Sequence, residues 1–343
     1  MRRRPKRIIF LTIYALFLLF LGECGARAFW FSRGVPFFTA QRQIHRSLYP
    51  GVPAIQRAVR RDESTEDTFD VLLLGGSVLS PRYGDVEHVL RERLARALDQ
   101  PVNVYNLGEP AHTSLDSYYK YEHLAAIDFD VVLVYHGINE LRANNCPPDV
   151  FKADYSHFSW YSLINAYERR ADARWFVLPY TVRFVVVKAA GRLGWSGFLP
   201  THEPDPDAFA FGCNVKTAAS LQRNLTGLLH TAVSRNQRVI LMSFAYYLPD
   251  DYTDERFEAR LLDYTVHTHP VTLWGSPECV RKGLDVHNMQ IKNLAETSKT
   301  VRFVDQDRLI PESARFFNDV CHLTHEGCER FVENLMEVIL PEG

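Results

Sequence analysis

Residues 69–77 read Phe69-Asp70-Val71-Leu72-Leu73-Leu74-Gly75-Gly76-Ser77, an apolar run that ends in two glycines and a serine. A short apolar run of this kind is typical of a strand that is buried on both faces of a parallel sheet. Similar runs occupy residues 102–107 and 129–135, and apolar residues at helical spacing fill the intervals at 84–99 and 114–127. This alternation of strand and helix predicts an α/β fold.

The alternation continues toward the C-terminus. We expect a helix at 216–235, a strand at 238–243, a helix at 280–297, a strand at 301–304 and a last helix at 325–339. The chain thus supplies five strands for one central parallel sheet with helices on both faces.

The interval between the third and fourth strands contains an insertion, at about residues 142–212, because loops of this kind usually have only about 2 to 6 residues. It is rich in aromatic residues, among them Trp160, Trp175 and Trp195, and it ends in a Pro- and Asp-rich stretch at 200–207. We favour a helical subdomain with its own small core. A lid or a membrane-facing surface is the alternative, since large apolar patches tend to mark binding sites.

The N-terminal segment is basic and then apolar. Its cations are Arg2, Arg3, Arg4, Lys6 and Arg7, and an apolar run follows from Ile8 to Leu21. The run is either the core of a cleaved signal peptide or a signal anchor, and we favour the anchor because aromatic residues typical of a membrane interface follow at 29–31. Residues 1–31 are then the anchor, 32–66 a connector and 67–343 a folded domain outside the cytoplasm, which cleavage would release as a secreted protein.

The overall charge is nearly balanced, with 39 Lys and Arg against 41 Asp and Glu. Nucleic-acid binding relies on a basic field, so we expect no nucleic-acid partner. The six cysteines, at 24, 146, 213, 279, 321 and 328, can pair outside the cytoplasm, but the pairing stays open. They lack the spacing of a structural zinc site, and we expect neither metal nor cofactor. The oligomeric state is not readable from the sequence.

Four polar segments follow the predicted strands or precede the last helix. They contain Ser77, Gly108, Asn139 and the run Asp319-Val320-Cys321-His322. In an open parallel sheet, sites form beyond the carboxyl ends of the strands, so we expect these segments to converge at one edge.

The converging residues suffice for acyl transfer. A serine hydroxyl needs a neighbouring base, which His322 supplies for Ser77 if Asp319 orients its ring. The amides of Ser77 and Gly108 and the side chain of Asn139 are candidate donors to a tetrahedral oxyanion. A helix that began at Ser77 would add a favourable dipole.

In this order, the four segments resemble the conserved blocks of the SGNH, or GDSL-like, hydrolase superfamily, and the resemblance covers about residues 69–341. It implies a three-layer flavodoxin-like sandwich, in which Ser77, Gly108, Asn139 and His322 are the residues that name the superfamily and Asp319 completes the triad. Two blocks depart from the pattern. A glycine stands at position 76 where many members have Asp, and a glutamate stands at position 140 where Asp is common.

Several other polar residues have structural interpretations. We expect His325 to open the last helix, His267 and His269 to lie on a solvated loop, and residues 274–277 to form a turn before a helix. The glycosylation sequon at Asn224 falls within a predicted helix.

Three functions fit these residues. The first is hydrolysis of an acyl ester through an acyl-Ser77 intermediate, on a cell-envelope carbohydrate or lipid. The second is transfer of the same acyl group to a sugar hydroxyl, and exclusion of water would separate the two. The third is a membrane-anchored binding protein without turnover, against which the intact set of Ser, Asn, Asp and His argues.

Overall fold

The computed structural model describes residues 4–38, 43–62, 68–168, 176–193, 197–200 and 205–340. Outside these ranges lie Arg2, Arg3, Trp175, Trp195 and half of the Pro- and Asp-rich stretch, residues 201–204. The chain divides into two compact units, of which the smaller comprises residues 1–53 and 156–199 and the larger comprises residues 54–155 and 200–343. The middle of the predicted insertion therefore clusters with the N-terminal segment.

The larger unit is built on a five-stranded sheet in the order β2-β1-β3-β4-β5, and all of its pairings are parallel. The strands are β1 (Phe69–Gly75), β2 (Val102–Asn106), β3 (Val131–Tyr135), β4 (Val239–Met242) and β5 (Val301–Val304). This order is that of the flavodoxin-like doubly wound sheet. The α/β fold class expected from the sequence is confirmed.

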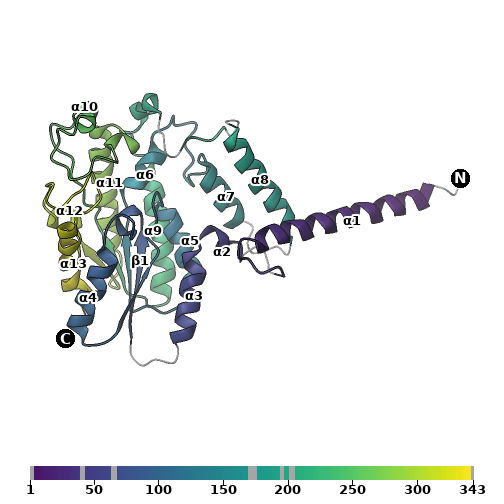
Figure 1. Cartoon of the computed structure of the whole chain (residues 1–343), viewed down its shortest axis with the longest axis horizontal. Coiled ribbons are helices and arrows are strands. Elements are labelled where there is room, and N and C mark those ends of the chain that lie inside the picture. Colours follow the sequence, from purple (N-terminus) through teal and green to yellow (C-terminus); the bar gives the residue numbers. More distant parts are fainter. Residues whose placement is uncertain are drawn as a thin grey trace. The chain divides into compact units, whose positions relative to one another are not determined.

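The helices of the larger unit connect these parallel strands and cover the sheet. They are α3 (Gly51–Asp62, whose first residues belong to the smaller unit), α4 (Val86–Leu98), α5 (Ser114–Leu124), α6 (Ile138–Asn144), α9 (Thr217–Ser234), α10 (Asp254–Glu258), α11 (Pro277–Ala295), α12 (Gln306–Leu309) and α13 (His325–Ile339). The described part of the larger unit also has the 3-10 turns η2 (Ser77–Leu79), η4 (Pro206–Phe211) and η5 (Val271–Leu273). Helices α4 and α13 pack together on one face of the sheet, and α5 packs on α9 on the other (Figure 1).

The register of the strands places the carboxyl ends of β1, β2 and β3 next to one another. Every side chain of β3 is buried, as expected for a central strand of a parallel sheet. Gly75 at the end of β1 pairs with Tyr135 at the end of β3, and Leu73 pairs with Asn106 at the end of β2. The segments after β1, β2 and β3 therefore leave the sheet side by side.

The smaller unit is helical. It contains α1 (Arg4–Phe31), α2 (His45–Leu48), α7 (Ser159–Glu168) and α8 (Leu178–Arg192). Among the described residues, one helix is long and apolar enough to cross a membrane, and it spans Lys6–Phe31.

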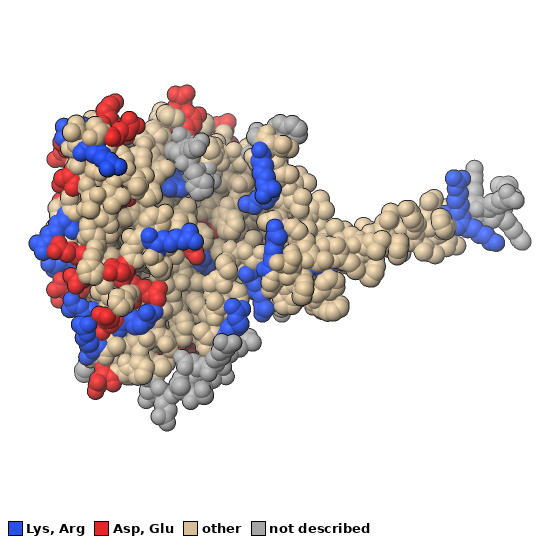
Figure 2. Space-filling view, in the orientation of Figure 1, with Lys and Arg blue, Asp and Glu red and all other residues tan. Residues whose placement is uncertain are grey.

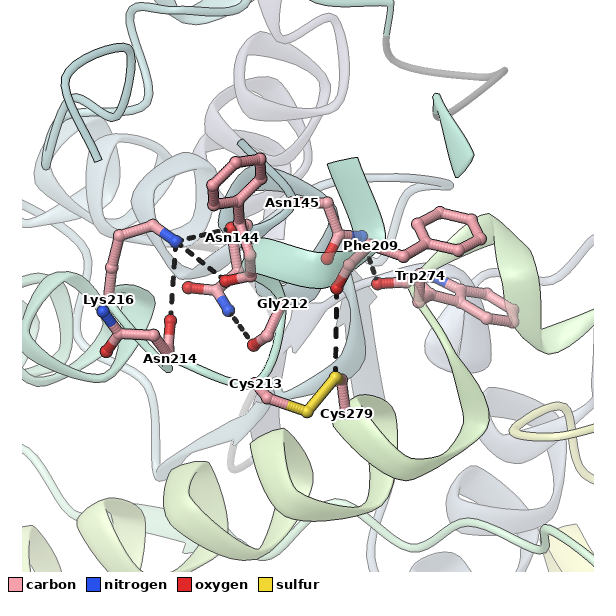
Figure 3. Close-up of a disulfide and its surroundings, with 10 residues drawn as sticks. Asn144, Asn145, Phe209, Gly212, Cys213, Asn214, Lys216, Trp274 and Cys279 are labelled. Carbon is pink, nitrogen blue, oxygen red and sulfur yellow. Dashed lines mark hydrogen bonds between the residues drawn. A yellow bond between two sulfur atoms is a disulfide. The ribbon is translucent and has the colours of Figure 1, made fainter. Parts of the chain in front are cut away.

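One disulfide, between Cys213 and Cys279, ties the segment after η4 to the first turn of α11 (Figure 3). It answers the cysteine pairing that the sequence left open, since the other four cysteines are free thiols. Beside it, the Asn145 side chain donates a hydrogen bond to the carbonyl of Trp274 (2.7 Å). A disulfide typically adds about 2–4 kcal/mol of stability, so this bond fixes the turn that carries Trp274.

Candidate active site

Ser77, His322 and Asp319 form a continuous hydrogen-bonded chain, although 245 positions separate Ser77 from His322. The Oγ of Ser77 lies 2.9 Å from Nε2 of His322, and Nδ1 of His322 lies 2.8 Å from Oδ2 of Asp319. Since the carboxylate can only accept, it fixes the proton of His322 on Nδ1 and leaves Nε2 as an acceptor for the serine hydroxyl.

The Asp319 carboxylate is held ionised by its partners. Its Oδ1 accepts from the backbone amides of Cys321 (3.0 Å) and His322 (2.9 Å) in addition to the imidazole. Burial alone would raise the pKa of Asp319, but the hydrogen bonds from His269 and His322 outweigh it and hold that pKa well below its usual value. The carboxylate is therefore negatively charged throughout the neutral range and can stabilise a protonated His322.

His269 also contacts this carboxylate, which the sequence did not predict. Its Nδ1 lies 3.1 Å from Oδ2 of Asp319. The ring of Tyr83 stacks on His322, with the centroids 4.4 Å apart, and meets His269 edge-on at 5.5 Å. The expectation of a solvated loop is therefore wrong for His269. A histidine distant in sequence from the catalytic blocks carries no local signal that could have revealed this contact.

Ser77 opens a 3-10 turn rather than a helix. The turn η2 is three residues long, and the next helix begins only at Val86. The favourable dipole that a helix beginning at Ser77 would have added is therefore absent, because η2 ends at Leu79 and α4 begins only at Val86. The amide of Ser77 nevertheless lies in the first turn, where backbone N–H groups have no acceptor within the turn itself. It is available to a reacting oxygen.

The amide of Asn139 is oriented by its neighbours. Its Nδ2 donates to the carbonyl oxygen of His112 (2.9 Å), and its Oδ1 accepts from Nε1 of Trp274 (3.4 Å). A carbonyl oxygen can only accept and an indole N–H can only donate, so the amide cannot be flipped. One N–H of the group remains for a substrate oxygen.

The glycine at position 76 leaves room for this amide. A Cβ atom at Gly76 would lie 2.6 Å from Nδ2 of Asn139. The departure from the Gly-Asp-Ser pattern therefore has a steric consequence, because any side chain at this position would displace Asn139.

Gly108 is arranged differently from the other two candidate donors. Its amide donates to Oδ1 of Asn106 (2.7 Å), and Nδ2 of Asn106 in turn donates to the carbonyl oxygen of Leu79 (2.6 Å). Asn106 thus ties the Gly108 loop to the turn that carries Ser77. The Gly108 N–H must be shared with Asn106 or released by it before it can serve an oxyanion.

A buried polar network lies behind these loops. Nζ of Lys120 donates to the carbonyl of Leu107 and lies 2.7 Å from Nδ1 of His112, which links the two backbone segments beside the candidate oxyanion hole. Burial lowers the pKa of Lys120 to about 8. On α6, burial raises the pKa of Glu140 to about 7, and its Oε1 accepts from the amide of Ser114 (2.6 Å).

The same network contains a second pair of serine and histidine. Nε2 of His136 lies 2.7 Å from Oγ of Ser117, and both side chains are buried. Burial lowers the pKa of His136 to about 3. Among the described residues, no carboxylate hydrogen-bonds this imidazole.

The remaining sequence candidates have structural roles. His325 is the first residue of α13, as predicted. Its Nδ1 hydrogen-bonds Asp85. Asn224 is buried on α9 and donates to Ser114, so it is not exposed for glycosylation. Residues 274–277 do form a turn before a helix.

One group of side chains among the described residues has the composition of a metal site, namely His269, Asp319 and His322. Their ligand atoms lie within 4.8 Å of one another. Those atoms already form the hydrogen bonds of the chain that ends on Ser77, so a metal ion would have to displace them. The geometry favours the hydrogen-bonded arrangement.

The space beside the serine is small. A cavity of about 10 Å³ is lined by residues at the ends of β1, β3 and β4 and in the segments that follow them, among them Ser77, Gly137, Asn139 and Phe244. This is room for about one water molecule.

Comparisons with family models and with curated proteins found no match to this chain. Among solved structures, the chain is similar to a GDSL-like lipase from Bacteroides thetaiotaomicron, with 12% identity over 84% of this chain and 98% of that one and a TM-score of 0.41. It is also similar to an acetyl xylan esterase, with 12% identity over 79% and 100% of the two chains and a TM-score of 0.42. A variant of an acetylxylan esterase from Geobacillus stearothermophilus has 14% identity over 80% and 94%, with a TM-score of 0.43. At such low identities and TM-scores, the chemistry has to be argued from the geometry of the site.

Proposed function

We propose that this protein is a serine esterase of the SGNH type, with Ser77 as nucleophile, His322 as general base and Asp319 as the group that orients His322. The observation that carries the proposal is the hydrogen-bonded chain from the Ser77 hydroxyl through both nitrogens of His322 to the Asp319 carboxylate. That arrangement provides what a serine lacks at neutral pH, namely a base aligned on its proton.

In the first half of the reaction, Oγ of Ser77 forms a bond to the ester carbonyl carbon while its proton passes to Nε2 of His322. The carbonyl oxygen becomes an oxyanion, which the amide of Ser77 and the free N–H of Asn139 stabilise. Collapse of this intermediate breaks the bond to the leaving alkoxide, which takes the proton from His322. The acyl group remains on Ser77.

In the second half, water replaces the alcohol. His322 takes a proton from the water as it attacks the acyl carbon, and a second oxyanion forms at the same donors. Its collapse breaks the bond to Ser77, whose oxygen regains the proton from His322, and the carboxylic acid leaves. Asp319 stays ionised throughout and stabilises the imidazolium in both halves.

We infer that the acyl group is short and that it is carried by a cell-envelope carbohydrate or lipid. The small cavity beside Ser77 has room for a group about the size of water, such as the methyl of an acetyl group, and this supports a short acyl group rather than a long alkyl chain. The apolar helix at Lys6–Phe31 supports retention at a membrane as an uncleaved signal anchor, with the hydrolase domain outside the cytoplasm.

The test is turnover of p-nitrophenyl acetate and p-nitrophenyl octanoate by the detergent-solubilised full chain, together with labelling by a fluorophosphonate probe. We expect labelling and a preference for acetate, both abolished in Ser77→Ala. Ser117→Ala is the matched control, because it removes the other serine that hydrogen-bonds a histidine. Labelling that survives in Ser77→Ala, or turnover lost equally in both variants, would overturn the assignment.

Acyl transfer to a sugar hydroxyl is the second candidate function. The observation that favours it is the low exposure of the nucleophile, since only 7% of Ser77 is accessible and a site with little water favours other acceptors. Adding an oligosaccharide to the p-nitrophenyl acetate assay distinguishes the two functions. Acetylated sugar at the expense of free acetate identifies a transferase, and an unchanged yield of acetate identifies a hydrolase.

A further inference from the structure

Helix α8 of the smaller unit exposes an apolar face. Its exposed residues Val182, Val185, Val186 and Leu193 follow helical spacing and lie on one side of the helix. We call these four residues the α8 stripe. Leu178, at the start of the helix, lies on the same face, one turn before Val182. A contiguous apolar face of this kind marks an interaction surface.

The opposite face of α8 is fixed to α1. The carboxylate of Glu23 accepts hydrogen bonds from the amides of Val177 (3.0 Å) and Leu178 (2.9 Å), and so caps the first turn of α8. Nε1 of Trp30 donates to Oγ1 of Thr181 (2.8 Å). Figure 1 shows that α8 meets the C-terminal part of α1 and then runs across it rather than along it.

The depth of α1 in a bilayer determines where α8 lies. All 14 residues from Ile8 to Leu21 are exposed, but at 1.5 Å per residue they span only about 21 Å. The hydrocarbon core of a bilayer is about 30 Å thick. If Ile8 lies at one boundary, the other boundary lies beyond Glu23, and the first turn of α8 is at the depth of the acyl chains.

The charged and polar groups at this depth have hydrogen-bond or ion-pair partners. Glu23 pairs with Nε of Arg27 at 2.8 Å while it accepts the two amides at the start of α8. A charged pair with its hydrogen bonds satisfied is the form in which an acidic residue is found within a membrane. The cluster therefore permits immersion of the junction between α1 and α8.

An apolar groove borders the junction. It has a volume of 430 Å³ and is lined by Leu16, Leu19, Phe20, Glu23, Phe176, Leu178 and Pro179. Leu178 belongs both to this lining and to the face of the α8 stripe. The groove and the stripe thus form one continuous apolar surface, which begins on the segment of α1 that would be surrounded by lipid.

The charges around this surface suit a lipid headgroup layer. The described cations of the smaller unit with described side chains are Lys6, Arg7, Arg27, Arg33, Arg46, Arg183, Lys188 and Arg192, and its described acids are Glu23 and Glu168. Figure 2 shows an uncharged length of α1 followed by blue side chains on this unit. Cations near a bilayer surface attract anionic headgroups, at about 1 kcal/mol each.

From this geometry we propose that the α8 stripe docks on the lipid leaflet next to the hydrolase domain, with its side chains among the acyl chains and a lipid chain in the groove. α8 is then an interfacial helix that adds to the anchor, of the kind whose apolar face is buried about 5–10 Å into the leaflet. The inference rests on the proposed membrane anchor. It explains how a short exposed apolar segment and an immersed glutamate fit one membrane.

The experiment places an NBD fluorophore on the stripe of the full chain, reconstituted in vesicles of phosphatidylcholine and phosphatidylglycerol. Cys24→Ser removes the one partly exposed free thiol, and Val182→Cys or Val186→Cys then carries the label. Met289→Cys is the matched control, an exposed apolar residue on α11 of the larger unit. Lipids with a shallow doxyl group should quench the labels at 182 and 186 and leave the label at 289 bright, whereas aqueous iodide should do the reverse.

Two results would overturn the proposal. Iodide quenching at 182 and 186 equal to that at 289 would place the stripe in water. Labels protected from both quenchers would place it against a protein surface, such as a second copy of this chain. Carbonate extraction of the same vesicles tests the membrane anchor separately. If the chain resists extraction but the doxyl lipids do not quench the labels at 182 and 186, the anchor is supported and the docking of the α8 stripe is refuted.

Discussion

Two serine–histidine hydrogen bonds among the described residues are of nearly equal length, yet just one of these two belongs to a candidate active site. Ser77 and His322 lie 2.9 Å apart at the carboxyl edge of the sheet, and Ser117 and His136 lie 2.7 Å apart beneath it. The first imidazole has an ionised carboxylate on its other nitrogen. Burial lowers the pKa of the second imidazole, that of His136, to about 3, so this ring is a poor acceptor of a proton at neutral pH.

Under the proposed function, this difference predicts that a short hydrogen bond to histidine does not by itself activate a serine. Activation needs a partner that stabilises the imidazolium, and Asp319 is such a partner because it accepts two imidazole and two backbone hydrogen bonds. The Ser77 site also has an oriented candidate donor for an oxyanion, the side chain of Asn139. The contrast between the two sites can be tested by mutation.

The largest effect is expected from Ser77→Ala, which removes the nucleophile. We predict a loss of kcat for p-nitrophenyl acetate of about 10⁴-fold or more. Ser117→Ala should leave kcat unchanged and lower the free energy of unfolding by about 1–3 kcal/mol, since it leaves a buried imidazole without its partner. Steady-state kinetics and urea unfolding measure both; a catalytic defect in Ser117→Ala would refute the distinction between the pairs.

Asp319→Asn removes the carboxylate behind His322, so the Ser77–His322 pair then resembles the Ser117–His136 pair. The amide no longer stabilises an imidazolium and permits the wrong tautomer of His322, so kcat should fall by about 10⁴-fold. The fold should persist, because the side chain still reaches the amides of Cys321 and His322. Circular dichroism is the control, and full activity in a folded variant would contradict the role of the carboxylate.

Asn139→Ala tests the candidate oxyanion donors of the Ser77 site. Loss of one such donor typically lowers kcat by about 10²–10³-fold. KM should change little, because the interaction strengthens in the transition state. An equal loss of stability and turnover would instead make Asn139 a structural residue that holds the carbonyl of His112.

His269→Gln should have a smaller effect, about fivefold on kcat, since it weakens one of several hydrogen bonds to Asp319. The pH profile carries the sharper test. Without the His269 contact the pKa of Asp319 moves up, so the carboxylate becomes protonated earlier as the pH falls. The carboxylate still accepts from His322 and from two backbone amides, so it should remain ionised in the neutral range and the profile there should keep its shape. Loss of activity already in the neutral range would contradict the role of His269 as one of several donors.

Glu140→Gln tests the buried side of α6. Burial raises the pKa of Glu140 from 4.5 to about 7, so the folded state holds the proton more tightly and stability falls as the pH rises between these values. Gln does not titrate, and the free energy of unfolding should then vary less between pH 5 and pH 8, by on the order of 3 kcal/mol at most. Urea unfolding at the two pH values provides the measurement. The same dependence in both proteins would contradict a buried, titrating carboxyl.

The sequence was sufficient for the strands because each is an apolar run with glycine or polar residues at its end. β5 was predicted at 301–304 and is found there, and α13 likewise spans 325–339. These elements are defined by local periodicity, which a single sequence displays. The helix after β1 was predicted at 84–99 and α4 spans Val86–Leu98, whereas the short 3-10 turn at Ser77 was not predicted.

Some residues of the candidate site were likewise predicted from the sequence, and others were found only in the structure. The residue types in the four blocks identified Ser77, Asn139, Asp319 and His322, because each block follows a strand or precedes a helix at the same edge. His269 and Tyr83 were not predicted to contact the site, because loops bring them to Asp319 and His322 without any local pattern. The turn at 274–277 was interpreted as structural by default, and Trp274 in it hydrogen-bonds Asn139. Likewise, the link between Cys213 and Cys279 depends on which helices pack together.

The sequence by itself therefore determined the α/β class, the five strands, the apolar N-terminal helix and the residues of the four blocks, all of which follow from short-range patterns of polarity. Tertiary structure decided which serine is paired with a histidine that has a carboxylate behind it. It also decided which face of α8 is held by Glu23 and Trp30 and which is left exposed. Both depend on contacts between residues far apart in the chain, where local polarity carries no information about the partner.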